Sequence, residues 1–405
     1  MQHVVLVAPY FSDNMRHCVR CFLDLPDTKV AVLSQEALDR VPADLRPRLA
    51  EYRQIGDPAH AANLVEGART IGKAWGRIDR LEGYLETLQV PIAEARDALD
   101  IDGMRAEVAR NFRDKNRMKD VLRRAGVPVA RQALVQTADD VRTFVQQVGY
   151  PIVMKPLAGF GARNTQRVTD EASLATALNT LLPSAQNPAQ AEEFVRGEEH
   201  TFEAVVIGGK VVWSSSTEYI PSPLQVLENP WMQYSLILPR EMHPEHVRSF
   251  APINQQALTA LGVQHGLSHM EWFRREDGSA VVSEVGARPP GANIMPLLQA
   301  AHGADPWAAW ARLMVQREWH FPDRRFAAGT IFLRAKGGGD VVRSVQGIEA
   351  MKARLGPALV DLKLPRPGQP RSQHYEGDGW VLVHHPETKG VVQALRTVLD
   401  TVSVV

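Results

Sequence analysis

The sequence predicts an α/β fold in its first third and α+β units after it. In the first third, two short apolar runs of strand length, at 3–8 and 29–34, alternate with polar stretches of helical pattern. That alternation is typical of a small doubly wound parallel sheet. At 151–168, a short apolar run, a glycine-bearing loop and a second run indicate a hairpin. Further short runs of strand type follow from residue 201.

Composition limits the class of partner. The chain has 405 residues, of which 44% are hydrophobic, so it can form two or three separate cores. Lys plus Arg (46) equals Asp plus Glu (46), so no overall field favours nucleic acid or a membrane surface. No apolar run reaches the roughly 20 residues of a membrane helix, and the first residues lack the basic segment of a signal peptide. We therefore expect a cytoplasmic protein that acts on small molecules.

The pattern divides into three expected units, 1–110, 111–200 and 201–405. Residues 79–125 are helical in pattern and must end before Pro128, which cannot continue a helix. In the middle unit we expect a helix at 171–182 and a strand at 191–195.

In the last unit, the segment 217–239 is apolar, Pro-rich and irregular, and we expect substrate contacts there. The other elements expected in this unit are strands at 201–207, 210–216, 267–273 and 280–285, a helix at 294–315, and strands at 329–335 and 380–385.

One predicted hairpin brings two glutamates together. Asp277-Gly278 favours a two-residue type I′ turn, because both central positions of that turn have positive φ. With that turn, Glu271 and Glu284 face each other, with Cβ atoms about 5 Å apart. His269 lies on the same face as both. Two such close carboxylates favour Mg²⁺, which binds carboxylate oxygens and bridges to phosphates; the alternative is a solvated hairpin that tolerates the repulsion.

Other patterns carry less information. Lys155 ends an apolar strand before Gly159 and Gly161, an arrangement that can hold phosphates but is also common without that role. The segment 67–74 nearly matches a P-loop, but an alanine stands where the metal-binding hydroxyl belongs, so we reject it. Cys18 and the cysteine three residues later form an isolated pair, which indicates two small buried side chains on one helix face.

Four segments in order resemble the ATP-grasp superfamily over nearly the whole chain. The segments are FRDKNRMKDVLRRAGVPVA (112–130), VMKPLAGFGARNT (153–164), AEEFVRGEEHTFE (191–203) and HMEWF…SEVGARPPGANI (269–294). The resemblance implies a doubly wound N-terminal domain, a small lid subdomain and a C-terminal mixed-sheet domain, with ATP and Mg²⁺ as cofactors.

The resemblance also implies roles for individual residues. Two lysines match the phosphate contacts, and the loop with Gly159 and Gly161 matches the lid over them. The remaining matches are Lys115 and Lys155 for phosphate, Glu192, Glu193, Phe194 and Val195 for the strand beside adenine, Glu199 for the ribose hydroxyls, Glu271 and Glu284 for Mg²⁺, and His269, Arg288, Gly291, Ala292 and Asn293 for substrate.

One departure concerns the metal. Many members carry Asn two residues after the second glutamate, where this chain has Gly286. A second metal would then have fewer protein ligands. The stretch EVGARPPGANIMP is most similar to bacterial L-amino-acid ligases and carnosine-synthase-like enzymes, in which Arg288 matches an arginine that steadies the acyl phosphate.

The implied reaction joins a carboxylate to an amine through an acyl phosphate, with Arg288 and Lys155 offsetting charge. No serine or cysteine nucleophile is needed. Rival hypotheses are a ligase for a nucleotide precursor or natural-product peptide, and a nucleotide-binding protein without turnover. His269 either contacts substrate, orients Glu271 or is purely structural. Dimers are the commonest soluble assembly, so we expect a homodimer.

Overall fold

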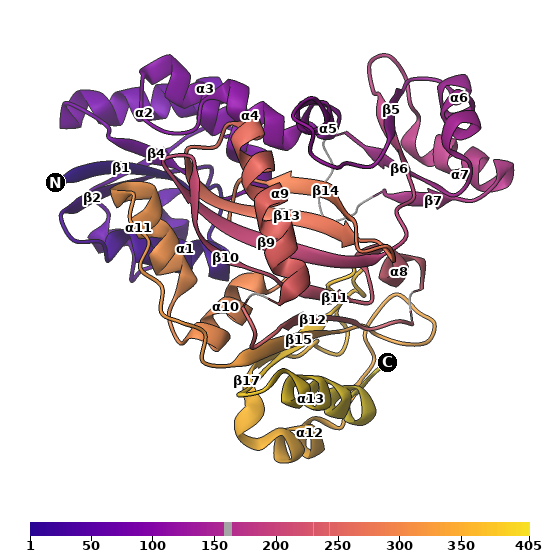
Figure 1. Ribbon diagram of the computed structural model, residues 1–405. Helices are drawn as coiled ribbons and strands as arrows, with labels where there is room; N and C mark the ends of the chain where they lie inside the picture. The colour runs from indigo at the N-terminus through magenta and orange to yellow at the C-terminus, as the bar shows by residue number, and fades with distance from the viewer. Residues whose placement is uncertain (158–163, 230, 243) are drawn as a thin grey trace.

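The computed structural model describes residues 1–157, 164–229, 231–242 and 244–405. Within them, three larger sheets and one two-stranded sheet are formed. Figure 1 shows an N-terminal sheet with its helices at the upper left, a small sheet at the upper right, and a long sheet running between and below them. The predicted α/β class followed by α+β units is confirmed.

The N-terminal sheet is parallel and covered on both faces. Val4 and Leu6 pack in one core with Phe22 of the first helix, whereas Val5 and Val7 pack in another with the two following helices. This alternation is what period two produces in a doubly wound sheet. The strand order is β3-β2-β1-β4, with β1 (Gln2–Val7), β2 (Thr28–Ser34), β3 (Glu51–Gln54), β4 (Arg80–Glu82), α1 (Asp13–Leu23), α2 (Ala61–Trp75) and α3 (Gln89–Leu99).

The expectation of an all-helical segment at 79–125 was wrong at its start. Residues 80–82 form β4, which pairs with β1 in parallel. A strand of three residues is too short to show an alternating pattern, and only its pairing with β1 defines it. The helices that follow are α3, α4 (Ala106–Arg113) and α5 (Lys115–Arg124).

The small sheet is antiparallel and carries two helices. Its order is β5-β8-β6-β7, and Lys155 near the end of β6 pairs with Gln190 of β8. We call this the lid sheet. Its elements are β5 (Gln132–Val135), α6 (Ala138–Val148), β6 (Ile152–Pro156), β7 (Gln166–Val168), α7 (Glu171–Leu181) and β8 (Ala189–Glu193).

The long sheet has nine described strands in the order β14-β13-β9-β11-β12-β15-β18-β17, with β10 paired to β9. Helix α9 covers one face, where Phe250 stacks on Trp272 at 4.0 Å between ring centroids. The elements are β9 (Glu198–Ile207), β10 (Lys210–Ser215), β11 (Glu218–Ile220), β12 (Tyr234–Leu238), β13 (His265–Arg274), β14 (Ala280–Gly286), β15 (Ala327–Leu333), β17 (Leu359–Lys363), β18 (Gly379–His385), α8 (Pro223–Glu228), α9 (Glu245–Leu261), α10 (Ile294–His302), α11 (Pro306–Gln316), α12 (Ile348–Leu355) and α13 (Thr388–Thr401), with a separate pair of β16 (Val345–Gln346) and β19 (Ser403–Val404).

Two further expectations in this unit were wrong. The segment 217–239 is not irregular, because β11, α8 and the fully buried strand β12 lie within it. The helix expected at 294–315 is two helices: Gly303 ends the first in the left-handed region, and Pro306 begins the second.

The hairpin β13–β14 pairs Glu271 with Glu284 as predicted, but by another route. The amide of Gly278 donates to the carbonyl of Arg275, so the turn spans 275–278 and the strands next to it pair one residue out of the predicted register. A bulge between Glu271 and Trp272 then shifts the register back. The predicted type I′ turn was therefore wrong, and the bulge restores the predicted pair.

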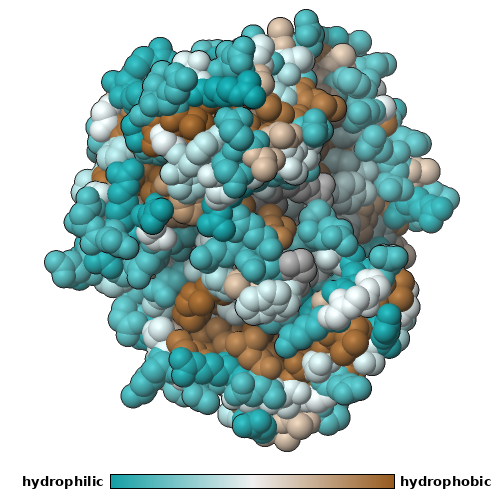
Figure 2. Space-filling view, turned by 90° about the vertical axis from the view of Figure 1, so that its right-hand side faces the viewer, coloured by the Kyte–Doolittle hydropathy of each residue, from teal (hydrophilic) through white to brown (hydrophobic). Residues whose placement is uncertain are grey.

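The outer surface is mixed. Polar side chains predominate on the face drawn in Figure 2, and apolar side chains gather in smaller patches between them. Among the described residues, we find no helix with the length and apolar character needed to cross a membrane.

Candidate active site

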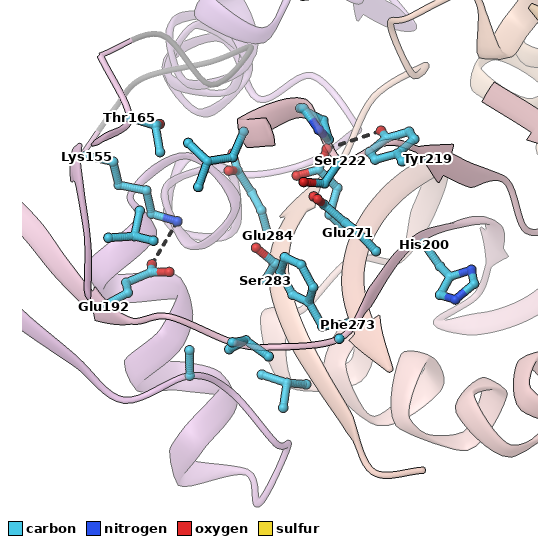
Figure 3. A pocket seen from close by; sticks show the side chains of 18 of the residues that line it. Lys155, Thr165, Glu192, His200, Tyr219, Ser222, Glu271, Phe273, Ser283 and Glu284 are labelled. Atoms are coloured by element: carbon cyan, nitrogen blue, oxygen red, sulfur yellow. Dashed lines mark hydrogen bonds and ion pairs between the residues drawn. The ribbon is translucent and has the colours of Figure 1, made fainter. Parts of the chain in front are cut away.

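A cavity of about 860 Å³ lies between the lid sheet and the strands β9, β11, β13 and β14. Figure 3 shows Lys155 and Glu192 entering it from the lid sheet, and Glu271 and Glu284 from the opposite wall. The short 3₁₀ helix Glu86–Leu88 of the N-terminal domain contributes Glu86. The site is therefore built by all parts of the fold.

The two paired glutamates point into this cavity. The ammonium group of Lys115 lies 2.7 Å from Oε1 of Glu284, and the hydroxyl of Tyr219 donates to Oε1 of Glu271 at 3.2 Å. Burial opposes ionisation of Glu284, but Lys115 and Lys155 lower its pKa overall. Two carboxylates at opposed positions of one hairpin form an oxygen-rich site that fits a hard divalent cation.

A buried cluster of lysines forms the adjoining wall. Oε1 of Glu192 forms ion pairs with the ammonium groups of Lys119, at 2.6 Å, and of Lys155, at 2.8 Å. Burial opposes ionisation, but the two lysines lower the pKa of Glu192 to about 2. Burial lowers the pKa of Lys119 to about 8, whereas for Lys155 the carboxylates of Glu192 and Glu284 outweigh burial and raise the pKa. The wall can hold a polyanion such as a phosphate chain.

His269 is a cation at neutral pH. Its Nδ1 lies 2.9 Å from Oε1 of Glu203, which is fully buried, and its Nε2 lies 3.7 Å from Glu271. Burial acts to lower its pKa, but the hydrogen bond to Glu203 and the nearby carboxylate of Glu271 raise it to about 9. The imidazolium therefore offsets charge beside the glutamate pair.

Arg288 follows β14 and is held by the N-terminal domain. Its Nε donates to Glu86, and its Nη1 donates to the carbonyl of Pro289 at 2.8 Å. Arg113 lies 3.8 Å from the other oxygen of Glu86. Burial acts to lower the pKa of Arg288, but Glu86 raises it. The guanidinium is thus fixed in the cavity wall within the field of the glutamates.

The other predicted residues divide into three groups. Glu199 lines the cavity, and burial together with Glu271 raises its pKa. The amide of Asn293 donates to Thr330 at 3.4 Å, and Asn293 does not line the cavity. Gly159 and Gly161 lie outside the described residues. The remaining predicted residues that line the cavity are Glu193, Phe194, Val195, Gly291 and Ala292.

The two rejected patterns have structural roles. Residues 67–74 lie within α2, so they form no phosphate loop. Cys18 and Cys21 are buried on α1 as predicted. Burial raises the pKa of both thiols, which makes them poor nucleophiles.

Comparison with known proteins assigns the family. The model of the ATP-grasp domain matches residues 120–297, which include Lys155 and both glutamates. Residues 120–297 are an ATP-grasp domain. An L-amino acid ligase from Bacillus licheniformis has a similar structure, with a TM-score of 0.76 and 19% identity, covering 100% of this chain and 98% of that one. This likeness confirms the ATP-grasp fold.

Sequence relatives of this ATP-grasp protein are distant. An uncharacterized protein of Sinorhizobium fredii is 24% identical over 87% of this chain and 70% of its own length. The alanine–anticapsin ligase of Bacillus subtilis is 25% identical over 60% of this chain. The chain spans 55% of that ligase.

Several residues of the ATP-grasp site were missed from the sequence. Lys119 lies one helical turn after Lys115, so its i,i+4 spacing on α5 was an available signal. Glu203 is two residues from Thr201 on β9, but its link to His269 exists only across the sheet. Glu86 reaches the cavity from a distant segment, and no local pattern marks it; Tyr219 lies in the segment 217–239, where substrate contacts were expected, although the sequence did not single it out.

Proposed function

We propose that the protein is a Mg-ATP-dependent carboxylate–amine ligase that releases ADP and phosphate. The observation that carries this proposal is the meeting, in one cavity, of the Glu271–Glu284 pair with three lysines and Arg288. Such a set matches phosphoryl transfer, in which positioning and charge compensation supply most of the catalysis.

The nucleotide fits the side of the cavity formed by the lid sheet. Residues 192–195 offer backbone groups to a base, and Glu199 lies where the resemblance puts the ribose. The carboxylate of Glu192 is already engaged by Lys119 and Lys155. We therefore assign Glu192 to positioning the lysines, and base recognition to the backbone.

Glu271 and Glu284 would hold Mg²⁺, whose chemistry is to bridge phosphate oxygens and neutralise the charge that develops on them. Lys115 now occupies Glu284, at 2.7 Å. A divalent cation held by Glu271 and Glu284 would compete with Lys115 for Glu284, and the ammonium group of Lys115 would then be able to bind a phosphate oxygen. The ion pair thus holds both side chains in place before the nucleotide binds.

The reaction has two balanced steps. A carboxylate oxygen of the substrate attacks the γ-phosphorus, and the bond to the bridging oxygen breaks to give an acyl phosphate and ADP. The amine of the second substrate attacks the acyl carbon, phosphate leaves with the C–O bonding pair, and the amine loses a proton to form the amide. Attack by the amine turns the acyl carbonyl oxygen into an oxyanion. Once the guanidinium of Arg288 leaves Glu86, it would stabilise this oxyanion with two hydrogen bonds.

Amino acids are the substrate class we propose. The supporting comparisons are the L-arginine-specific L-amino acid ligase of Bacillus subtilis, 24% identical over 55% of this chain, and the solved L-amino acid ligase. N5-carboxyaminoimidazole ribonucleotide synthetases share the fold, with a TM-score of 0.69 for the Thermotoga maritima protein, and they favour the alternative of a nucleotide-precursor ligase no more strongly.

The test is phosphate release with Mg-ATP against all pairs of proteinogenic amino acids, with mass spectrometry of the products. Release matched by a dipeptide mass supports the proposal, and Glu284→Gln should lower the release about 100-fold or more. If ATP binds but no amino-acid pair stimulates release, the amino-acid assignment fails. Release with 5-aminoimidazole ribonucleotide and bicarbonate would support the alternative.

A further inference from the structure

A second cluster of metal-ligating side chains lies on the same sheet, apart from the glutamate pair. His200 of β9, Glu218 of β11 and His246 of α9 each offer one ligand atom, and these atoms all lie within 4.8 Å of one another. Figure 3 shows His200 set away from Glu271 and Glu284. None of the roles derived above uses these three residues.

The backbone holds two of the three residues in fixed relation. His200 and Glu218 are direct partners across the antiparallel strands β9 and β11, so their side chains share one face. His246 comes from the first turn of α9, which packs over that sheet. The rings of His200 and His246 are 5.1 Å apart between centroids. A rigid sheet and a packed helix therefore aim three ligands at one point.

His200 lacks the hydrogen bonds that a buried imidazole normally has. It is 5% exposed, and neither ring nitrogen has a hydrogen-bond partner among the described residues. Oε2 of Glu198 lies 3.7 Å from its Nε2, beyond hydrogen-bonding distance. Buried polar atoms without partners cost free energy and call for an explanation. The ring also stacks on Trp272, with centroids 5.0 Å apart, so it cannot readily turn toward other partners.

We propose that His200, Glu218 and His246 bind a divalent transition metal of the Zn²⁺ class. Two imidazoles and one carboxylate are a ligand set that such metals prefer, and a water completes four-coordination. Ligand atoms of a tetrahedral Zn²⁺ site are about 3.4 Å apart at bond lengths of roughly 2.0–2.1 Å. The upper limit of 4.8 Å thus requires an inward movement of about an ångström, which rotamer changes of Glu218 and His246 would supply while the stacked ring of His200 stays in place.

The protonation states of the two histidines suit metal ligands. Burial and the neighbouring His246 lower the pKa of His200 to about 4, so its imidazole is neutral at pH 7. Burial also lowers the pKa of His246. Both rings can therefore donate a lone pair without first losing a proton.

Binding there would tie β9, β11 and α9 together at the edge of the cavity. All three residues line it, and His200 directly follows Glu199, the residue proposed to contact the ribose. The metal would therefore stabilise the wall on which the nucleotide rests. It would take no part in phosphoryl transfer, which belongs to the glutamate pair.

The test uses the full chain without nucleotide, titrated with Co²⁺ and then Zn²⁺ in excess Mg²⁺. Mg²⁺ competes for the oxygen site at Glu271 and Glu284 but not for an imidazole pair. Another described cluster, His17, Cys21 and Asp305, is the main competitor for Co²⁺. It contains a thiol, so binding there would add a thiolate-to-cobalt charge-transfer band, and His17→Ala is the matched control.

We expect one Co²⁺ per chain with d–d bands of tetrahedral type and no thiolate band, and displacement of Co²⁺ by Zn²⁺. His246→Asn and Glu218→Gln should each weaken binding at least about tenfold, while His17→Ala leaves it unchanged. Circular dichroism checks that each variant is folded. If the variant His200→Gln does not fold, the variant of the less buried His246 still tests the proposal. Absence of binding to the wild type, or binding lost in His17→Ala and kept in His246→Asn, would overturn the proposal.

Discussion

Replacing Glu192 by Gln tests the charge balance of the lysine cluster. Glu192 is 6% exposed and neutralises two buried ammonium groups, those of Lys119 and Lys155. The change keeps the shape of the side chain but leaves both lysines without this counter-charge. Breaking a buried ion pair from one side costs about 3–5 kcal/mol of stability.

The lowered pKa of Glu192 gives a similar magnitude for the stability that this ion-pair cluster contributes. The pKa of Glu192 falls from its ordinary value of 4.5 to about 2, which corresponds to about 3 kcal/mol. Because the folded-state pKa is depressed, this contribution is complete above pH 4.5 and is lost as the pH falls toward 2. Lys119, whose pKa is already lowered to about 8, would lose its proton near neutral pH in the variant. Because Lys119 would then be neutral, we expect the loss of stability to lie near 3 kcal/mol, the lower end of the range of about 3–5 kcal/mol.

The measurement is urea unfolding at pH 7, followed by tryptophan fluorescence, with Glu193→Gln as matched control. Glu193 is the next residue, but its partners Arg131 and Arg275 are 59% and 39% exposed. Exposed pairs contribute about 0–1 kcal/mol. We expect Glu192→Gln to lose about 3 kcal/mol and the control no more than about 1. Equal losses in the two variants would refute the argument that buried lysines depend on Glu192.

Three further outcomes are expected. Glu284→Gln removes a metal ligand and the partner of Lys115, so phosphate release should fall about 100-fold or more while the circular-dichroism spectrum is retained; near-normal turnover would contradict the metal role. The pKa of His269 is raised to about 9, so its stabilising contribution is complete below pH 6.5 and is lost as the pH rises through 9; NMR titration should show this shift, and Glu203→Gln should lower the pKa. Arg288→Lys keeps the charge but loses the bidentate fork, so it should lower kcat about 100-fold with little change in ATP affinity; an effect on ATP affinity alone would place Arg288 elsewhere.

Much of the site was predictable because several of its residues belong to local patterns, in which the interacting positions are close together in the sequence. Glu271 and Glu284 are linked by a single hairpin, and Lys155 lies one residue before the end of a strand that is followed in the sequence by glycines. The turn geometry was wrong, however, because a bulge one residue after Glu271 has no distinct sequence signal. The correct pair arose from two opposite shifts of one residue.

Contacts between distant segments could not be predicted in the same way. Glu86 meets Arg288 from 202 residues away, and Glu203 meets His269 from a strand that pairs only after the sheet has formed. The strand β4 shows the same limit on a smaller scale, since its three residues become a strand only through β1.

The sequence by itself determined the alternating elements of the first third, the lid hairpin and the hairpin that carries the two glutamates, because strand and turn preferences act over a few residues; the bulge that sets the glutamates opposite each other belongs to the folded sheet. Only the tertiary structure decided which charges meet. It placed Glu192 between two buried lysines, joined Glu86 to Arg288, and brought His246 of a helix to His200 and Glu218 of a sheet. The physical reason is that pKa values and ligand sets depend on burial and distance in space, and neither quantity is encoded by spacing along the chain.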